Sequence, residues 1–147
     1  MTLAGQKLWL TPATRNDKGF ILSTWVRSYL PIVRKTEHCY KHHTLRISEE
    51  TYLANHPRIA ESLWENALVL RDEEDGSAIL GYVVADTAAC ILDYVYVIPD
   101  LRNVGLAKVM IRAAAGDNPE VTHMWPFRWR SGWKYNPYLA QRALNAK

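Results

Sequence analysis

The sequence predicts an α/β fold in a single domain that spans residues 1–147. Segments rich in β-branched and aromatic residues, which favour strands, alternate with segments whose apolar residues recur every three or four positions, as in helices. Three strand-like segments follow one another between residues 67 and 98, and a helical segment then forms one crossover before a last strand. The expected order of elements is β-α-α-β-β-β-α-β.

The chain begins with a strand and a helix. Residues 6–14 form a short strand-like segment that contains a proline near its end. Thr14 and Asp17 have the spacing of a capping box, which marks the start of a helix. Apolar residues then recur at helical spacing from Ile21 to Leu30. Pro31 is expected to end this helix.

The remaining elements follow from capping residues, prolines and apolar runs. A second helix is expected to begin at Ser48, with Pro57 restarting it as a first-turn proline. After it come a hairpin, a third strand, a helix and a last strand, over residues 67–86, 90–98, 104–115 and 120–125. In the last of these helices Lys108 and Arg112 are almost the only polar residues, so it is expected to be buried on most sides.

Composition excludes several classes of protein. Apolar residues make up 48% and charged residues 22%, as in soluble globular proteins. No apolar run reaches the ~18 residues of a membrane span, and the N-terminus lacks the pattern of a signal peptide, so we expect a cytoplasmic protein without a membrane partner. Cys39 and Cys90 form no disulfide framework, and Cys90 is expected to be a small buried residue. The net charge of +3 is compatible with an anionic ligand or a nucleic acid and diagnostic of neither.

The junction between the third strand of the meander and the following helix has the features of a phosphate site. The first N–H groups of a helix have no intrahelical partner, and the helix dipole places partial positive charge there. A phosphate or pyrophosphate binds well at such a helix start. Gly105 lets a ligand approach the backbone closely, and Ala107 is small. Arg102 and Lys108 add positive charge.

The residues Arg102-x-x-Gly105-x-Ala107 resemble the signature Q/R-x-x-G-x-G/A of the GCN5-related N-acetyltransferases (GNAT). The Val-Ile-Pro-Asp stretch before them is similar to the family's V-x-P-x-x-R, and the elements upstream have the family's order. The resemblance covers about residues 6–116, with Asn103 where the family usually has glycine. It implies a mixed, mostly antiparallel central sheet with flanking helices, shortened at the C-terminus relative to the family.

The resemblance also implies acetyl-CoA as cosubstrate. The backbone of Val95, Tyr96 and Val97 would pair with the pantetheine arm, as an added strand would. A backbone N–H in this region would polarise the thioester carbonyl as negative charge develops on it. The other implied cofactor-binding residues form the signature turn, where the pyrophosphate would bind: Arg102, Asn103, Val104, Gly105, Leu106, Ala107 and Lys108.

Acetyl transfer to an amine also needs a base and an acid. An amine like that of lysine has a pKa of ~10.4 and must lose a proton, and the leaving thiolate must gain one. Asp93, four residues before Val97, is a candidate base, with a solvated strand residue as the alternative. Tyr135 or Tyr138 is the candidate acid, because residues 135–144 loosely resemble the N-x-x-A-x-x-x-Y region of the family.

Two further clusters have several interpretations. In Glu37–His43 the spacing of cysteine and histidine would suit zinc, but no second ligand pair follows, so we expect no metal. These residues are expected to line the acceptor cleft or to form a solvated loop. In residues 125–138, aromatic residues interleaved with Arg and Lys suit packing on the sheet, stacking on nucleic-acid bases, or a protein interface.

The sequence therefore predicts an acetyl-CoA-dependent N-acetyltransferase. Its acceptor would be a primary amine on a protein, an aminoacyl-tRNA or a small molecule. The short length and the aromatic tail resemble small phage-encoded members, whose setting would be the host cytoplasm. The alternative is a catalytically silent protein on the same scaffold, which would contact RNA or a host protein through its basic aromatic C-terminal segment. The sequence does not decide between a monomer and a homodimer.

Overall fold

A computed structural model describes residues 2–3, 5–37, 48–123 and 133–145. Within these residues seven strands form one sheet in the order of the sequence. They are β1 Thr2–Leu3, β2 Gln6–Pro12, β3 Ala67–Asp72, β4 Ile79–Asp86, β5 Ile91–Val97, β6 Glu120–Val121 and β7 Lys134–Tyr135. Neighbours from β1 to β5 are antiparallel, whereas β6 and β7 are added in parallel. The predicted mostly antiparallel α/β fold is confirmed.

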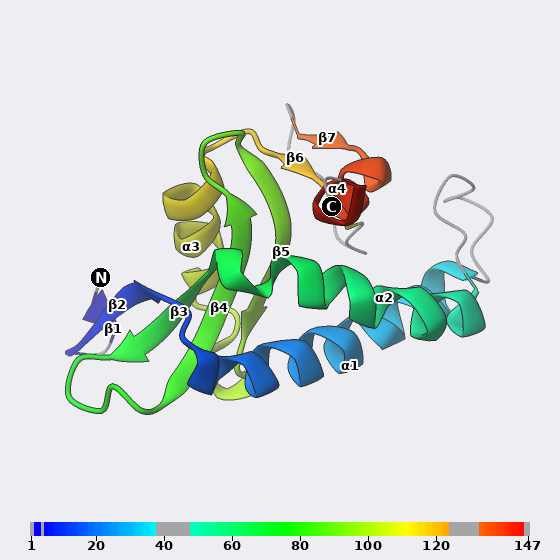
Figure 1. Cartoon of the computed structure of the whole chain (residues 1–147). Coiled ribbons are helices and arrows are strands. Elements are labelled where there is room, and N and C mark those ends of the chain that lie inside the picture. Colours follow the sequence, from blue (N-terminus) through cyan, green and yellow to red (C-terminus); the bar gives the residue numbers. More distant parts are fainter. Residues whose placement is uncertain (1, 4, 38–47, 124–132, 146–147) are drawn as a thin grey trace.

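Helices cover both faces of the sheet (Figure 1). The helices α1 Lys18–Glu37 and α2 Glu49–Leu63 lie side by side on one face, and α3 Leu106–Ala115 packs against β4 and β5. The short helices are η1 Arg15–Asp17, η3 Trp64–Asn66, η4 Pro99–Leu101, η5 Pro137–Gln141 and α4 Arg142–Asn145. In the described part of the chain no helix combines the length and the apolar character that a bilayer crossing requires.

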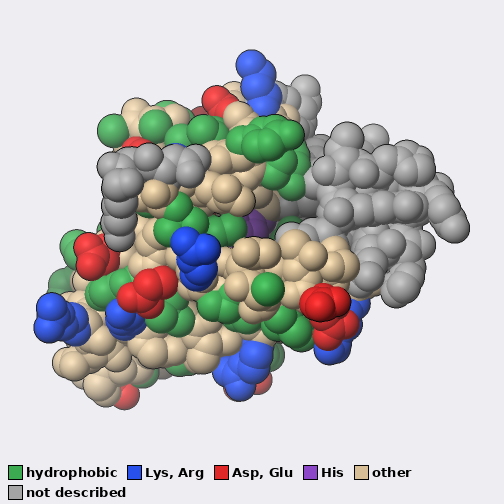
Figure 2. Space-filling model, turned by 45° about the vertical axis from the view of Figure 1, so that its right-hand side comes forward, with side chains coloured by type: hydrophobic (Ala, Val, Ile, Leu, Met, Phe, Trp, Pro, Cys, Tyr) green, Lys and Arg blue, Asp and Glu red, His purple; other side chains and the backbone are tan. Residues whose placement is uncertain are grey.

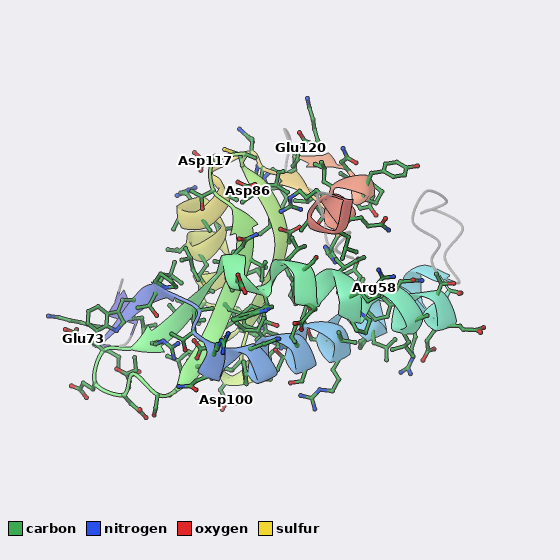
Figure 3. All side chains as sticks on the ribbon, viewed as in Figure 1. Arg58, Glu73, Asp86, Asp100, Asp117 and Glu120 are labelled. Atoms are coloured by element: carbon green, nitrogen blue, oxygen red, sulfur yellow. The ribbon has the colours of Figure 1, made fainter. Side chains whose placement is uncertain are left out.

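Helix α3 is the predicted crossover. It carries the chain from the end of the sheet where Asp100 lies to the end where Asp117 and Glu120 lie (Figure 3). The next strand therefore starts beside the beginning of β5 and runs parallel to it. The buried face of α3 consists of apolar residues at helical spacing: Leu106, Met110, Ile111, Ala114 and Ala115.

The core beneath α1 is aromatic. Trp25 stacks on Tyr94 with ring centroids 5.4 Å apart, and both side chains are buried. The hydroxyl of Tyr94 bonds that of Ser28 at 2.6 Å, and the hydroxyl of Tyr82 bonds that of Thr24 at 2.8 Å. Helix α1 therefore supplies hydroxyl partners for phenols that burial would otherwise leave unpaired.

The helix starts agree with the sequence. The Thr14 N–H donates to the Asp17 carboxylate at 2.8 Å, as in a capping box. The Ser48 hydroxyl oxygen accepts the Thr51 N–H at 3.1 Å and caps α2. These short local contacts depend on neighbouring residues alone.

The predicted effects of Pro31 and Pro57 are wrong, because both prolines lie inside helices, Pro31 in α1 and Pro57 in α2. A proline within a helix removes one backbone hydrogen bond and costs about 3 kcal/mol. Tyr29 and Val33, on either side of Pro31, are both buried. Burial of apolar side chains on both sides of the proline offsets that cost, so the helix continues.

The prediction that Cys90 is buried is also wrong. Cys90 is exposed and has a φ of 55°, in the left-handed region, at the end of the turn between β4 and β5. The chain must reverse within Thr87–Cys90, and this reversal places Cys90 outside the strand. The apolar run that begins at Cys90 thus starts one residue before β5, which begins at Ile91.

Strand β5 has a β-bulge in its middle. Val84 pairs with Tyr94 and Ala85 pairs with Leu92, so Asp93 is the extra residue. Strand β6 pairs only with the first two residues of β5, and the last contact is the Thr122 N–H to the Leu92 carbonyl at 3.1 Å. Among the described residues the pairing of β6 with β5 ends at this bond, whereas β5 continues to Val97 along β4.

A substitution at Gly81 tests whether β4 and β5 lie so close together that position 81 has no room for a side chain. A Cβ at Gly81 would lie 2.5 Å from the Tyr96 carbonyl oxygen, whereas a Cβ at Gly19 in α1 would meet nothing within 4 Å. We expect Gly81→Ala to lower the free energy of unfolding by about 1–3 kcal/mol through overpacking. We expect Gly19→Ala to raise it by up to about 1 kcal/mol through helix propensity. Urea denaturation measures both, and equal midpoints for Gly81→Ala and wild type would contradict the close approach.

Candidate functional site

One backbone edge of β5 is directed away from β4. The Ile98 N–H donates to the Leu80 carbonyl at 3.0 Å, so Ile98 faces β4. Backbone groups of successive strand residues point in alternate directions, which directs those of Val95 and Val97 to the opposite side. The Val97 carbonyl there accepts a hydrogen bond from Arg102 Nε at 2.8 Å. Among the described residues no strand pairs with this edge beyond Leu92, so its backbone groups are available to an extended ligand.

The turn before α3 has two residues in the left-handed region, Asn103 at a φ of 67° and Gly105 at 86°. Asparagine tolerates this conformation better than most residues, which explains how Asn103 can replace a glycine. Gly105 is the N-cap of α3, and the Val109 N–H donates to its carbonyl at 3.3 Å. The N–H groups of residues 106–108 consequently have no acceptor within the helix.

The edge and the turn open into one cleft of about 840 Å³. Its walls are the second half of β5, the turn with the first residues of α3, and one side of α1. All predicted cofactor-binding residues line it except Val104, which is 55% exposed. The predicted residues thus lie together: Val95, Tyr96, Val97, Arg102, Asn103, Gly105, Leu106, Ala107 and Lys108.

The cleft is cationic. Arg27, Arg102 and Lys108 are the charged residues that line it, and no described acidic residue does. The Arg102 guanidinium lies 5.5 Å from the centroid of the Tyr96 ring, within cation–π range. This charge distribution favours an anionic ligand.

Asp93, the candidate base, does not line this cleft and is fully buried. The two guanidinium nitrogens of Arg142 donate to its oxygens at 2.9 and 2.7 Å, and the Thr122 hydroxyl donates at 2.9 Å. The alternative that Asp93 is a solvated strand residue is therefore wrong. The carboxylate joins the bulge of β5 to α4 and to the residue that follows β6.

The two candidate acids lie away from the cleft as well. Tyr138 is 86% exposed on η5. Tyr135 is partly buried in β7, and burial raises its pKa to about 12. Neither tyrosine lines the cleft, so the role of thiolate acid stays a prediction for both.

Two buried histidines extend the network of Asp93. The Thr122 hydroxyl has one proton, which goes to Asp93, so its contact of 2.8 Å with His123 Nδ1 needs that nitrogen as the donor. His123 Nε2 then accepts from His56 Nε2 at 2.7 Å. This leaves His56 Nδ1 as a buried acceptor without a hydrogen-bond partner. On the face that Figure 2 shows, histidine atoms are visible as a small patch.

Burial keeps this histidine pair neutral. It lowers the pKa of His123 to about 3 and that of His56 well below the usual value. Sequence analysis missed both residues. The available signal was the spacing of His56 from Tyr52 and Ala60, four residues away on each side, which places it on the buried face of α2.

Sequence analysis also missed the α1 wall of the cleft. Thr24, Arg27, Ser28 and Pro31 line it together with Ile32. Their spacing of three and four residues gives one stripe along a helix that is otherwise largely apolar. That stripe was the signal for a second wall.

The two clusters with several interpretations lie mostly outside the described residues. These exclude residues 38–47, which contain Cys39 and three histidines, and residues 124–132 of the aromatic segment. Among the residues that the structure does describe, no three metal-ligating side chains come together.

Comparison with known proteins gives similar structures. No family model and no curated protein matches the sequence. The apo form of YjaB from Escherichia coli has a TM-score of 0.50 and 15% identity, over 74% of this chain and 64% of that chain. A GCN5-related N-acetyltransferase from Rhodopseudomonas palustris has a TM-score of 0.46 and 15% identity, over 77% and 65%. The aminoglycoside N-acetyltransferase AAC(6′)-Iy, in complex with CoA, has a TM-score of 0.36 and 16% identity, over 78% and 70%.

These similarities concern the fold. The chain spans just under two thirds of the first two structures, 64% and 65% of their lengths. The order of the strands and the parallel addition of β6 to β5 agree with the architecture expected from the sequence. The fold of this chain is therefore similar to that of YjaB, and its mixed, mostly antiparallel sheet is the architecture that the signature predicted.

The histidine pair makes a prediction about pH. A histidine whose pKa is lowered by folding stabilises the protein above its unfolded pKa of ~6.5, and this stability is lost as the pH falls below that value. We expect the free energy of unfolding to fall between pH 6.5 and 4.5 by up to about 1.4 kcal/mol per pH unit for each buried histidine. Urea denaturation across this range measures the slope, and His56→Gln should reduce it. A free energy that does not change over the range would contradict the neutral pair.

Proposed function

We propose that the protein is an acetyl-CoA-dependent N-acetyltransferase that acts on a primary amine. The observation that carries this proposal is the meeting of two backbone sites in one cleft. The edge of β5 at Val95 and Val97 and the open N–H groups at the start of α3 line the same cavity. Each site suits a different part of one long anionic cosubstrate.

The two backbone sites would bind different parts of acetyl-CoA. Backbone groups of Val95 and Val97 would pair with the amides of the pantetheine arm, as in β-strand addition. The N–H groups of residues 106–108, with Lys108 beside them, would hold the pyrophosphate. Acetyl-CoA brings the activated acyl group, and the chain holds it against one edge of the sheet.

Proton transfer is the task of hydroxyl groups in this proposal. No carboxylate or imidazole of the described residues lines the cleft, whereas Tyr94 and Ser28 do. Burial raises the pKa of Tyr94 to about 12, so its phenol stays protonated and can donate a hydrogen bond. Asp93 acts as a positioning residue that fixes the point where β5 and β6 separate.

The alternative function, a silent scaffold that binds RNA or a protein, depends on the basic aromatic segment. Most of that segment falls in residues 124–132, outside the described part. No feature of the described residues favours this alternative over the enzyme.

Substitution at the two ends of α3 tests the cosubstrate site. Gly105 and Gly116 both have positive φ, 86° and 83°, and an added Cβ would meet nothing within 4 Å at either. Both variants to glutamate therefore strain the backbone and add one negative charge. We expect wild type to bind acetyl-CoA in the micromolar range and Gly105→Glu to bind it at least about 100-fold more weakly, a loss of about 2.7 kcal/mol. Isothermal titration calorimetry measures both affinities.

Gly116→Glu is the matched control, because it lies at the far end of the same helix and does not line the cleft. We expect it to bind acetyl-CoA like wild type. Thermal unfolding confirms that each variant is folded. If the folded wild-type protein does not bind acetyl-CoA, or if both variants lose binding equally, the proposed function is wrong.

A further inference from the structure

The acceptor side of the cleft carries a positive charge that the cosubstrate turn does not use. Arg102 and Lys108 belong to the turn and to the first residues of α3, and Arg102 is bonded to the Val97 carbonyl. Arg27 lines the cleft from α1, on another wall. In the described part of the chain its guanidinium has neither an ion pair nor a hydrogen bond.

The position of Arg27 along the cleft follows from two contacts of α1. Early in the helix, the Phe20 ring lies 6.0 Å from that of Tyr96. Two turns later, the Ser28 hydroxyl bonds Tyr94 at 2.6 Å. Helix α1 thus passes from the turn end of β5 toward its bulge. Arg27, next to Ser28, lies at the bulge end, where a pantetheine arm that starts at the turn would place its thioester.

The side chain of Arg27 is exposed, and no described residue forms an ion pair with it. Arg27 also lines a smaller hollow between α1 and α2, whose other charged residue is Glu61. The Glu61 carboxylate forms an ion pair with Lys18. The polar neighbours of Arg27 on the cleft wall are the hydroxyls of Thr24 and Ser28, so an incoming acceptor meets a cation and hydroxyl groups.

We propose that the acceptor amine also carries an anionic group, an α-carboxylate or a phosphate, and that Arg27 binds this group. A guanidinium pairs with either anion through two parallel N–H donors. A polyamine would meet Arg27 and find no described carboxylate in the cleft. This inference rests on the proposed acetyltransferase function and adds the class of its substrate.

Transfer of the acetyl group needs only the acceptor amine and acetyl-CoA as reactants. The neutral amine attacks the thioester carbonyl, and a C–N bond forms. The C–S bond breaks and its electron pair goes to sulfur. The proton that the nitrogen loses passes to sulfur, which gives an amide and the thiol of CoA.

The anion at Arg27 could instead belong to the cosubstrate, whose ADP portion also carries phosphate. Two measurements on Arg27→Gln separate these sources. Acetyl-CoA affinity, measured by calorimetry, reports a contact with the cosubstrate. Kinetics with paired acceptors, measured as CoA thiol release, report a contact with the acceptor. Arg34→Gln is the control, because Arg34 lies on the same helix, pairs with Glu49 and does not line the cleft.

The acceptors are pairs that differ in one anionic group: phenylalanine with phenylalaninamide, and phosphoethanolamine with ethanolamine. Spermidine serves as the polycation. We expect wild type to acetylate the anionic member of at least one pair with the lower KM. Arg27→Gln should raise that KM about tenfold, equivalent to about 1.4 kcal/mol. It should leave the KM of the neutral member and the Kd of acetyl-CoA within about twofold, and Arg34→Gln should change none of these values.

Several results would overturn the inference. One is a preference for spermidine or for the members without an anion, and another is an equal effect of Arg27→Gln on both members of a pair. Weaker binding of acetyl-CoA by Arg27→Gln would assign the residue to the cosubstrate phosphate. Transfer to cationic or neutral amines alone refutes this inference and leaves the proposed function intact. If acetyl-CoA does not bind, both the proposed function and this inference are wrong. If acetyl-CoA binds but none of these acceptors reacts, this inference is wrong.

Discussion

The buried carboxylate of Asp93 is the constraint on which the arrangement of the site depends. A buried charge is stable only when it is paired and hydrogen-bonded, and removal of one partner typically costs about 3–5 kcal/mol. Asp93 meets this condition at the bulge of β5 with Arg142 from α4 and with Thr122, which follows β6. The contact lies where the pairing of β6 with β5 ends among the described residues, and the part of β5 that lines the cleft begins just beyond it.

The rest of the site extends from this point in two directions. Along β5, the edge at Val95 and Val97 leads to the turn at Gly105, so the backbone groups that would bind the cosubstrate form one continuous path. Away from the cleft, His123 and His56 continue the polar network to α2. Because these contacts are buried and directional, they hold α2, α4 and the two strands in one arrangement.

The fold and the residues of β5 and of the turn that line the cleft could be predicted from the sequence, because their signals are local. Apolar runs, capping residues and the spacing from Arg102 to Ala107 each lie within a short stretch, and the main elements follow the expected order. The sequence gives local signals for the α1 stripe and for His56, but not for their partners, which are far away in the chain: Ser28 meets Tyr94, and His56 meets His123. The continuation of α1 through Pro31 could not be predicted either, because burial of the helix on both sides of the proline overrides the tendency of proline to end a helix.

The most direct test of the account is a map of backbone amide shifts by NMR spectroscopy as acetyl-CoA is added. The account predicts that the amides of Val95, Val97 and residues 106–108 shift with one common affinity. The amide of Val69 in β3, which is buried and does not line the cleft, should not move. Shifts confined to other elements, or binding that leaves the amides of Val95 and Val97 unchanged, would contradict the claim that the free edge of β5 holds the cosubstrate.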